Sequence, residues 1–217
     1  MPPPTTVKPI QEEGGHQLAN QRQEKREPVL QAAQAVFVTN GYHGSSMEDI
    51  ARTARISKPV LYQYFPSKRE LYIELLDLNL RTLTDVLNES TRSTKHNKER
   101  VHDAIRAYYG YVARDDGAYR LVFESGLSND PDVSVRLAAF RADFAAAITQ
   151  IISEDAQLPL VEAELLGRGL TGLAQVSARF WIEATAEQGR AGLSLDRATE
   201  LIYRFAWRGI SRFPKDT

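Results

Sequence analysis

The chain has 217 residues, of which 42% are hydrophobic and 25% are charged, and its formal net charge at pH 7 is -1. This length and balance are typical of a globular protein with one large or two unequal domains, and they exclude a disordered or fibrous chain. The absence of cysteine excludes disulfide bonds, thiolate zinc sites and cysteine nucleophiles.

The N-terminal residues MPPPTTVKPIQEEGG lack the apolar core of a secretory signal, and no later run approaches the roughly 18 apolar residues of a membrane span. A cytoplasmic protein without membrane contact is therefore expected. Charge is unevenly spread, because residues 22–70 hold eight Lys and Arg against five Asp and Glu, whereas residues 71–217 are net negative. This asymmetry is too small to identify a partner by itself.

The first segment, residues 1–20, is rich in Pro, Gln, Glu and Gly and has almost no periodic apolar positions, so we expect a flexible arm. A first helix, with apolar residues at helical spacing, is predicted to end at Gly41, because glycine commonly ends helices. Ser45 and Glu48 form a capping-box pattern, which predicts a second helix over residues 46–54.

A third, short helix is predicted over residues 58–65, with Ser57 as its cap. Pro59 is tolerated there because the first N–H groups of a helix have no intrahelical partner. Ser67 begins another capping pattern, which predicts a fourth helix over residues 68–92.

The remainder also has helical periodicity, and no window alternates between apolar and polar residues as a strand would. We therefore expect an all-α fold of about nine helices, divided into an N-terminal domain at residues 21–70 and a C-terminal domain at 71–217. The last helix is capped by Ser194. The predicted apolar stripes are Ile105, Tyr108, Tyr109 and Val112; Val133, Leu137, Phe140, Phe144, Ile148 and Ile151; and Leu165, Leu166, Leu173, Val176, Phe180 and Trp181.

The two helices over residues 46–54 and 58–65 have the dimensions of a helix-turn-helix, whose second helix enters the major groove of DNA. Leu61 and Phe65 are four residues apart, so they should face inward together and leave the other side of the helix free. The expected DNA-binding residues are Ser46, Lys58, Pro59, Val60, Tyr62, Gln63, Tyr64 and Lys68.

Four of these residues have the chemistry that reads bases. Gln63 can pair with adenine through two hydrogen bonds, and Lys58 can meet guanine or phosphate. Pro59 and Val60 can touch the methyl group of thymine.

The other four suit the phosphate backbone, which fixes position without reading sequence. Ser46, Tyr62 and Tyr64 carry hydroxyls for phosphate oxygens, and Lys68 adds a charge in the first turn of the fourth helix. An alternative is that Tyr62 and Tyr64 only pack at the rim of an ordinary helical domain.

The run GYHGSSMEDIARTARISKPVLYQYFPSKREL resembles the DNA-binding domain of TetR-type transcriptional regulators over about residues 22–71. The resemblance implies a homodimer joined through the last two long helices, a ligand cavity in the C-terminal domain, and usually repression of transcription. The matching positions are Gly41, Tyr42, Ser45, Ser46, Ile50, Ala51, Ser57, Leu61, Tyr62, Phe65, Lys68 and Leu71.

One position departs from the family pattern. Arg55 stands where the family usually has glycine in the turn between the two helices. If the turn keeps its left-handed backbone, a residue with a Cβ there costs on the order of 1 kcal/mol.

In the C-terminal domain, aromatic residues on several helices could enclose an apolar pocket for a small apolar or amphipathic effector, although for any single one of them a place in the core is the favoured interpretation. Gly167, Gly169 and Gly172 lower helix propensity, which suggests either close helix approach at a dimer interface or a kink over the pocket. The candidate effector residues are Tyr108, Tyr111, Phe123, Phe140, Phe144, Phe180 and Trp181.

The sequence does not favour an enzyme, a metal site or a cofactor. None of its four histidines has metal-ligand spacing, and no nucleophile-elbow, Walker or dinucleotide-binding motif occurs. We therefore expect a sequence-specific DNA-binding regulator that acts as a homodimer on a palindromic double-stranded operator. The alternative is a helical protein–protein interaction module that does not read DNA.

Overall fold

The structure, a computed structural model, describes residues 12–92, 94–124, 126–127, 129–188 and 192–210. Every regular element within these ranges is an α-helix, which confirms the predicted fold class. None of these helices combines the length and apolar character needed to cross a lipid bilayer. The helices are α1 (Glu12–Gly44), α2 (Met47–Thr53), α3 (Lys58–Tyr64), α4 (Lys68–Arg92), α5 (Asn97–Val112), α6 (Ala118–Phe123), α7 (Pro131–Ala156), α8 (Leu160–Gln188) and α9 (Leu195–Ile210).

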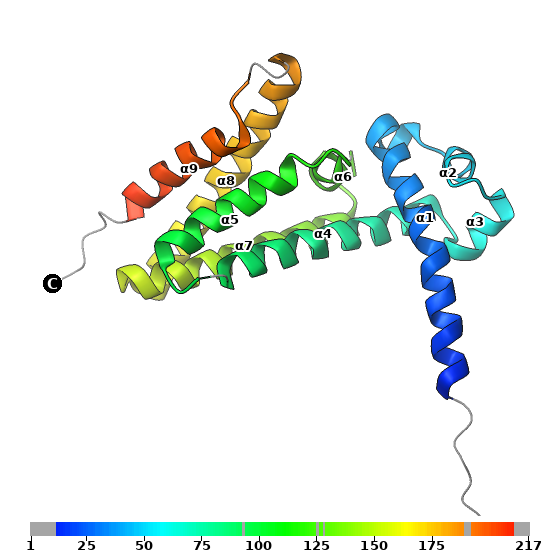
Figure 1. Cartoon of the computed structure of the whole chain (residues 1–217), viewed down its shortest axis with the longest axis horizontal. Helices are drawn as coiled ribbons and strands as arrows, with labels where there is room; N and C mark the ends of the chain where they lie inside the picture. The colour runs from blue at the N-terminus through cyan, green and yellow to red at the C-terminus, as the bar shows by residue number, and fades with distance from the viewer. Residues whose placement is uncertain (1–11, 93, 125, 128, 189–191, 211–217) are drawn as a thin grey trace, which may run out of the picture.

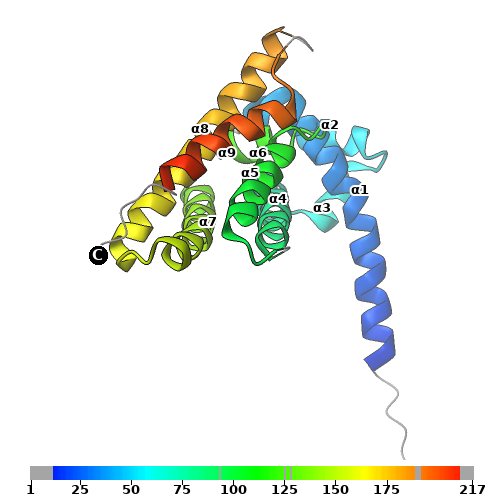
Figure 2. The same cartoon turned by 60° about the vertical axis from the view of Figure 1, so that its left-hand side comes forward.

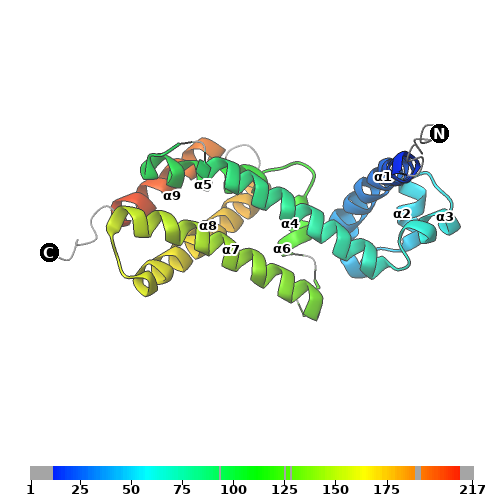
Figure 3. The same ribbon diagram turned by 90° about the horizontal axis from the view of Figure 1, so that it is seen from below.

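Helix α4 connects two groups of helices. Its first turns lie beside α1, α2 and α3 at one end of the molecule, and the rest runs between α5 and α7 in the larger group (Figures 1 and 3). Helices α8 and α9 contact each other along one side of the larger group (Figure 2). The predicted boundary at residue 70 therefore falls within a continuous helix.

Helix α1 begins earlier than predicted and projects away from the other helices at its N-terminal end (Figure 1). Residues 12–20, expected in a flexible arm, are helical, while residues 1–11 of that arm lie outside the described residues. At the other end, Gly41 leaves helical geometry with φ 68° and ψ 169°, in agreement with its predicted role.

The cap of α2 is one residue later than predicted. The Ser46 hydroxyl, not that of Ser45, accepts a hydrogen bond from the backbone N–H of Asp49 at 3.1 Å. Ser45 is buried, and its hydroxyl lies 2.6 Å from the carbonyl oxygen of Gly41. Ser45 therefore ties the helix-turn-helix to the end of α1.

Both later caps in this region stand at the predicted residues, but only one of them makes a side-chain capping hydrogen bond. The Ser67 hydroxyl accepts from the Glu70 N–H at 3.1 Å, as predicted. The Ser57 side chain makes no capping hydrogen bond, and only its carbonyl oxygen accepts from the Leu61 N–H. The proline in the first turn of α3 already fixes the local backbone there.

The predicted stripes on α5 and α7 are confirmed, because all of their residues are buried in the core. The third stripe is partly wrong, since Trp181 is buried but Leu165, Val176 and Phe180 are each more than 70% exposed. The three exposed residues lie close to one line along α8, at separations of 11 and four residues, whereas Trp181 lies about 100° further round. Helix α8 thus has two apolar faces, of which only one packs on the core.

The turn between α2 and α3 has the left-handed backbone that the sequence suggested. Arg55 has φ 56°. Replacing it with glycine should relieve strain of about 1–2 kcal/mol, partly offset by about 0.4–1 kcal/mol of greater unfolded-chain entropy. We expect Arg55→Gly to raise the melting temperature by about 2 °C in a thermal melt.

Arg55→Ala is the control, because it removes the charge but keeps the Cβ that causes the strain. Its melting temperature should stay near that of the wild type. An unchanged or lower melting temperature for Arg55→Gly would show that the turn stores no such strain.

Candidate nucleic-acid interface

Helix α3 is held from behind by buried residues. Leu61 is fully buried and Phe65 is 1% exposed, as predicted. The guanidinium of Arg26, on α1, lies 4.5 Å from the centre of the Phe65 ring and forms an ion pair with Glu74 of α4. A helix of seven residues has little stability alone, so these contacts with α1 and α4 fix its orientation.

The opposite side of α3 is open. Lys58, Pro59, Tyr62 and Gln63 are exposed, and Tyr62 retains 42% of its accessible surface. Val60 is half-buried. Helix α3 lies at the opposite end of the molecule from α8 and α9, so these side chains are accessible to a large partner (Figure 3).

Tyr64 differs from Tyr62. It is half-buried and packs against the apolar core, which fits the alternative of a rim-packing tyrosine for this residue. Tyr62 is 42% exposed and agrees better with the DNA-binding prediction.

Ser46 is exposed at the start of α2, but its hydroxyl is already engaged. It donates to a carboxylate oxygen of Asp49 at 2.6 Å. This hydrogen bond and the nearby Arg52 guanidinium hold the pKa of Asp49 below its ordinary value. A phosphate contact by Ser46 would therefore have to compete with a carboxylate.

Lys68 has contacts that the sequence did not indicate. Its ammonium donates to the carbonyl oxygens of Tyr42 at 2.9 Å and Ser45 at 2.8 Å, and it lies 4.4 Å from the centre of the Tyr42 ring. Tyr42 lies in the last turn of α1 and Ser45 directly follows that helix, so Lys68 joins the end of α1 to α4. Only its remaining N–H is available for the predicted phosphate contact.

Lys68→Met is therefore expected to lower stability, because hydrogen bonds to charged groups contribute about 1.5–3 kcal/mol. The melting temperature should fall on the order of 5 °C. Lys58→Met is the matched control, because Lys58 is exposed and should have no effect on the melt. Equal melting temperatures for Lys68→Met and the wild type would contradict the structural role.

A second connection joins the first turn of α4 to α7. The Arg69 guanidinium donates to both carboxylate oxygens of Asp130 at 2.9 Å and to Asp132 at 2.6 Å. These hydrogen bonds from Arg69 hold the pKa of Asp130 below its ordinary value. The sequence Asp130-Pro131 is a signal for the start of a helix. Nothing in the neighbouring sequence indicates that Asp130 pairs with Arg69, which is 61 residues away.

The predicted effector residues do not surround one cavity. Phe123, Phe140, Phe144 and Tyr108 form a row of rings whose neighbouring centres are 6.0–6.2 Å apart, and all but Phe123 are buried. Burial raises the pKa of Tyr108 well above its usual range. These four residues therefore contribute mainly to the core.

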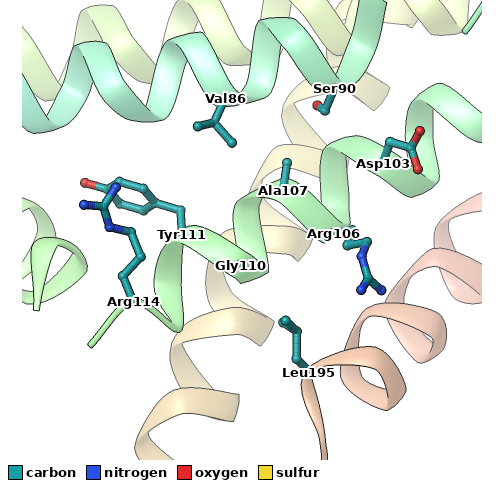
Figure 4. A pocket seen from close by; sticks show the side chains of 9 residues that line it. All are labelled: Val86, Ser90, Asp103, Arg106, Ala107, Gly110, Tyr111, Arg114 and Leu195. Atoms are coloured by element: carbon teal, nitrogen blue, oxygen red, sulfur yellow. The ribbon is translucent and has the colours of Figure 1, made fainter. Parts of the chain in front are cut away.

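The other three predicted effector residues lie elsewhere. Tyr111 lines a cavity of about 490 Å³ between α4 and α5 (Figure 4). Phe180 is exposed, Trp181 donates its indole N–H to the Leu193 carbonyl at 2.7 Å, and both line a cavity of about 380 Å³ between α8 and α9.

A larger apolar groove lies between α8 and α9, and the sequence analysis did not predict it. Its volume is about 890 Å³, and Leu165, Leu173, Leu201 and Phe205 are among its lining residues. Phe205 is 69% exposed. Gly169 lines the same groove, and a Cβ added there would meet no atom within 4 Å. By contrast, Gly167 lies against Thr149 and Ala145 of α7, which explains this glycine by close helix packing.

Helices α2 and α3 form a helix-turn-helix unit, and its attachment to a larger helical group is typical of DNA-binding transcriptional regulators. Residues 29–75 match the family described as "Bacterial regulatory proteins, tetR family". Over 203 residues, covering 93% of this chain and 90% of the relative, the sequence is 34% identical to the HTH-type transcriptional activator FasR of Mycolicibacterium smegmatis. The chain belongs to the TetR family; it is a DNA-binding transcriptional regulator and not an enzyme.

Solved structures share this fold. A TetR-like transcriptional regulator from Rhodococcus sp. RHA1 has a TM-score of 0.71 at 23% identity, over 87% of this chain and 97% of that one. The transcriptional regulator FadR from Bacillus subtilis, solved in complex with stearoyl-CoA, has a TM-score of 0.68 at 16% identity, over 83% and 97%. At these identities the likeness establishes the fold alone.

Proposed function

We propose that two copies of this chain bind a palindromic operator, each with α3 in the major groove, and that a small effector in the C-terminal helices changes operator affinity. The accessible outer side of α3, opposite the buried Leu61 and Phe65, is the main observation in favour. In this proposal residues 21–70 form the DNA-binding unit and residues 71–217 the effector-binding and dimerisation unit.

The exposed residues of α3 have separate roles in this proposal. Gln63 pairs with adenine, and Pro59 and Val60 contact thymine methyl groups. Lys58 and Tyr62 bind phosphate oxygens and position the helix. The exposure of these α3 residues supports their roles. Ser46 and Lys68 already form hydrogen bonds within the protein, so in this proposal they contribute less to DNA binding.

The outward face of α8 and α9 is the proposed dimer interface. Its apolar residues Leu165, Val176, Phe180 and Phe205 are each between 69% and 73% exposed in the single chain. A patch of this kind on a soluble protein usually marks an interaction site. A twofold axis through it would present α3 twice, as half-sites about 34–36 Å apart require.

An apolar or amphipathic effector fits the apolar linings of the C-terminal cavities. The stearoyl-CoA complex of FadR makes an acyl-CoA one reasonable ligand to test here. Coupling of about 1–3 kcal/mol between effector and operator would change occupancy roughly 5- to 150-fold.

The direction of regulation follows from operator position rather than from the fold. The family resemblance predicts repression, while the relative FasR is named an activator. We retain repression as the expectation. A promoter reporter tests it, because deletion of the operator raises expression under a repressor and lowers expression under an activator.

The proposal is tested by mapping the genomic DNA that the purified protein retains, followed by affinity measurements on the recovered sequence. Gln63→Ala should change the preferred base at one position of each half-site. Lys58→Met should weaken binding to all duplexes and lower the salt dependence by about one unit of slope. Failure to retain any duplex would favour the alternative of a protein–protein interaction module.

A further inference from the structure

A cavity of about 490 Å³ opens between α4 and α5, away from the row of core aromatic rings. Its size is within the range of small-molecule sites, about 300–1,000 Å³. Val86 of α4 and Ala107 of α5 face each other across it, with Leu195 from the start of α9 at the other side (Figure 4). Gly110 also lines the cavity, and a Cβ added there would meet no atom within 4 Å.

Two arginines and one acidic residue line the cavity: Arg106, Arg114 and Asp103. Arg106 forms an ion pair with Asp196, whose carboxylate lies 2.5 Å from the guanidinium. Arg114 forms an ion pair with Asp116, two residues along the chain, with the guanidinium Nε 3.0 Å from the carboxylate. The Arg114 side chain is 41% exposed, so an incoming anion can reach it.

Two routes of hydrogen bonds lead from this cavity to α1. On one, the carbonyl oxygen of Asp116 accepts from Gln34 Nε2 at 3.0 Å. On the other, the Tyr111 hydroxyl donates to the Asn79 carbonyl oxygen at 3.4 Å, and Asn79 Nδ2 donates to Gln34 Oε1 at 3.2 Å. Gln34 is therefore the residue of α1 at which both routes end.

The loop that contains Asp116 is itself packed on α1. The other Asp116 carboxylate oxygen accepts from the Ala118 N–H at 3.1 Å and so begins α6. Gly117 lies against Val38 of α1 with no room for a Cβ. Displacing Asp116 would consequently disturb both α6 and the position of α1.

We propose that this cavity binds a small organic anion with an apolar body. The anion replaces Asp116 as the ion-pair partner of Arg114, and this weakens the hydrogen bond between the Asp116 loop and Gln34 of α1. This inference rests on the proposed function, since it names the effector class and the path by which the effector acts on the helix-turn-helix. The apolar body lies against Val86, Ala107 and Leu195, and the anionic group is held by the Arg114 guanidinium.

Binding is tested with anilinonaphthalenesulfonate, an aromatic sulfonate that fluoresces in apolar sites, and with phenylnaphthylamine, the same ring system without the sulfonate. Gly110→Leu fills the cavity, and it should weaken binding of both probes about tenfold or more. Arg114→Gln should weaken only the sulfonate, again about tenfold, because a hydrogen bond to a charged group is lost.

The matched controls are Gly110→Ala, which improves helix propensity without filling the cavity, and Arg120→Gln, which removes an exposed arginine of α6. Both should bind the sulfonate as the wild type does. Equal sulfonate affinity for Gly110→Leu and the wild type would overturn the site. Equal loss of both probes in Arg114→Gln would overturn the anion preference.

The path to α1 is tested by hydrogen exchange without DNA. In the wild type, the sulfonate probe should speed exchange of the Ala118 amide and of α1 around Gln34. In Gln34→Met, the probe should bind with unchanged affinity and speed exchange at Ala118 only. No change at Ala118 in the wild type would overturn the displacement of Asp116, and equal acceleration of α1 in both proteins would overturn the role of Gln34.

Neither measurement uses DNA, so the two proposals can fail separately. A protein that binds the probe as described but retains no duplex would refute the proposed function alone. A protein that retains an operator but shows no effect of Gly110→Leu would refute this inference alone.

Discussion

Replacing Phe205 with glutamate is expected to convert a dimer into a monomer, with the dimer dissociation constant raised at least about a thousandfold. Phe205 lines the groove between α8 and α9 and is 69% exposed in the single chain. In a twofold interface each substitution appears twice, and an uncompensated buried charge costs about 3–5 kcal/mol. Operator binding should weaken strongly as well, because a monomer engages only one half-site.

Sedimentation and operator titration check this prediction. Val135→Glu is the matched control, since Val135 is 68% exposed on α7, outside the proposed interface. It should remain dimeric and bind the operator normally. A dimeric Phe205→Glu protein with normal operator affinity would show that α8 and α9 are not the interface.

Gly117→Ala is expected to lower the melting temperature on the order of 10 °C. Gly117 has φ 69°, which costs about 1–2 kcal/mol for a residue with a Cβ. The added Cβ would also lie 2.8 Å from Val38 Cγ2 and closer still to Cγ1, and such overpacking costs about 1–3 kcal/mol. Both penalties fall on the contact between α1 and the loop before α6.

Two comparisons separate the penalties. Gly126 has φ 73°, and a Cβ there would meet only His43, at an ordinary contact distance of 3.7 Å, so Gly126→Ala should show only the smaller backbone cost. Adding Val38→Ala to Gly117→Ala should recover part of the lost stability, because it removes both methyl groups that clash. A melting temperature for Gly117→Ala equal to that of Gly126→Ala would mean that Val38 moves aside freely.

The sequence was most informative where the determining interactions are local. The spacing of Leu61 and Phe65 identified the inner side of α3, and Ser67 correctly marked the start of α4. Ser45 and Ser46 show the limit of such signals, because either hydroxyl fits the capping pattern. The backbone after Gly41 decides which one caps α2.

Long-range contacts could not be predicted in this way. The partners of Lys68 lie 26 and 23 residues away, and its type and position equally suit a phosphate contact. The cavity between α4 and α5 depends on how three helices pack, which periodicity does not determine. Most of the aromatic residues that were predicted to bind the effector lie in the core. Aromatic side chains suit both a core and an apolar ligand pocket, so their sequence positions do not distinguish the two.

Helix α8 shows a related ambiguity. Its apolar residues were read as one stripe, but Trp181 faces the core and Phe180 faces outward. Apolar periodicity indicates that one face of a helix is buried. It does not indicate whether that face is covered by the same chain or by a second copy.

The central claim, that α3 reads the major groove twice from a symmetric pair of chains, is tested most directly by dimethyl sulfate footprinting on the recovered operator. This reagent marks guanine N7 in the major groove and adenine N3 in the minor groove. We predict protected guanines in two half-sites about 34–36 Å apart, lost together in Phe205→Glu. Protection confined to adenine N3, or to a single site that Phe205→Glu leaves unchanged, would contradict the account.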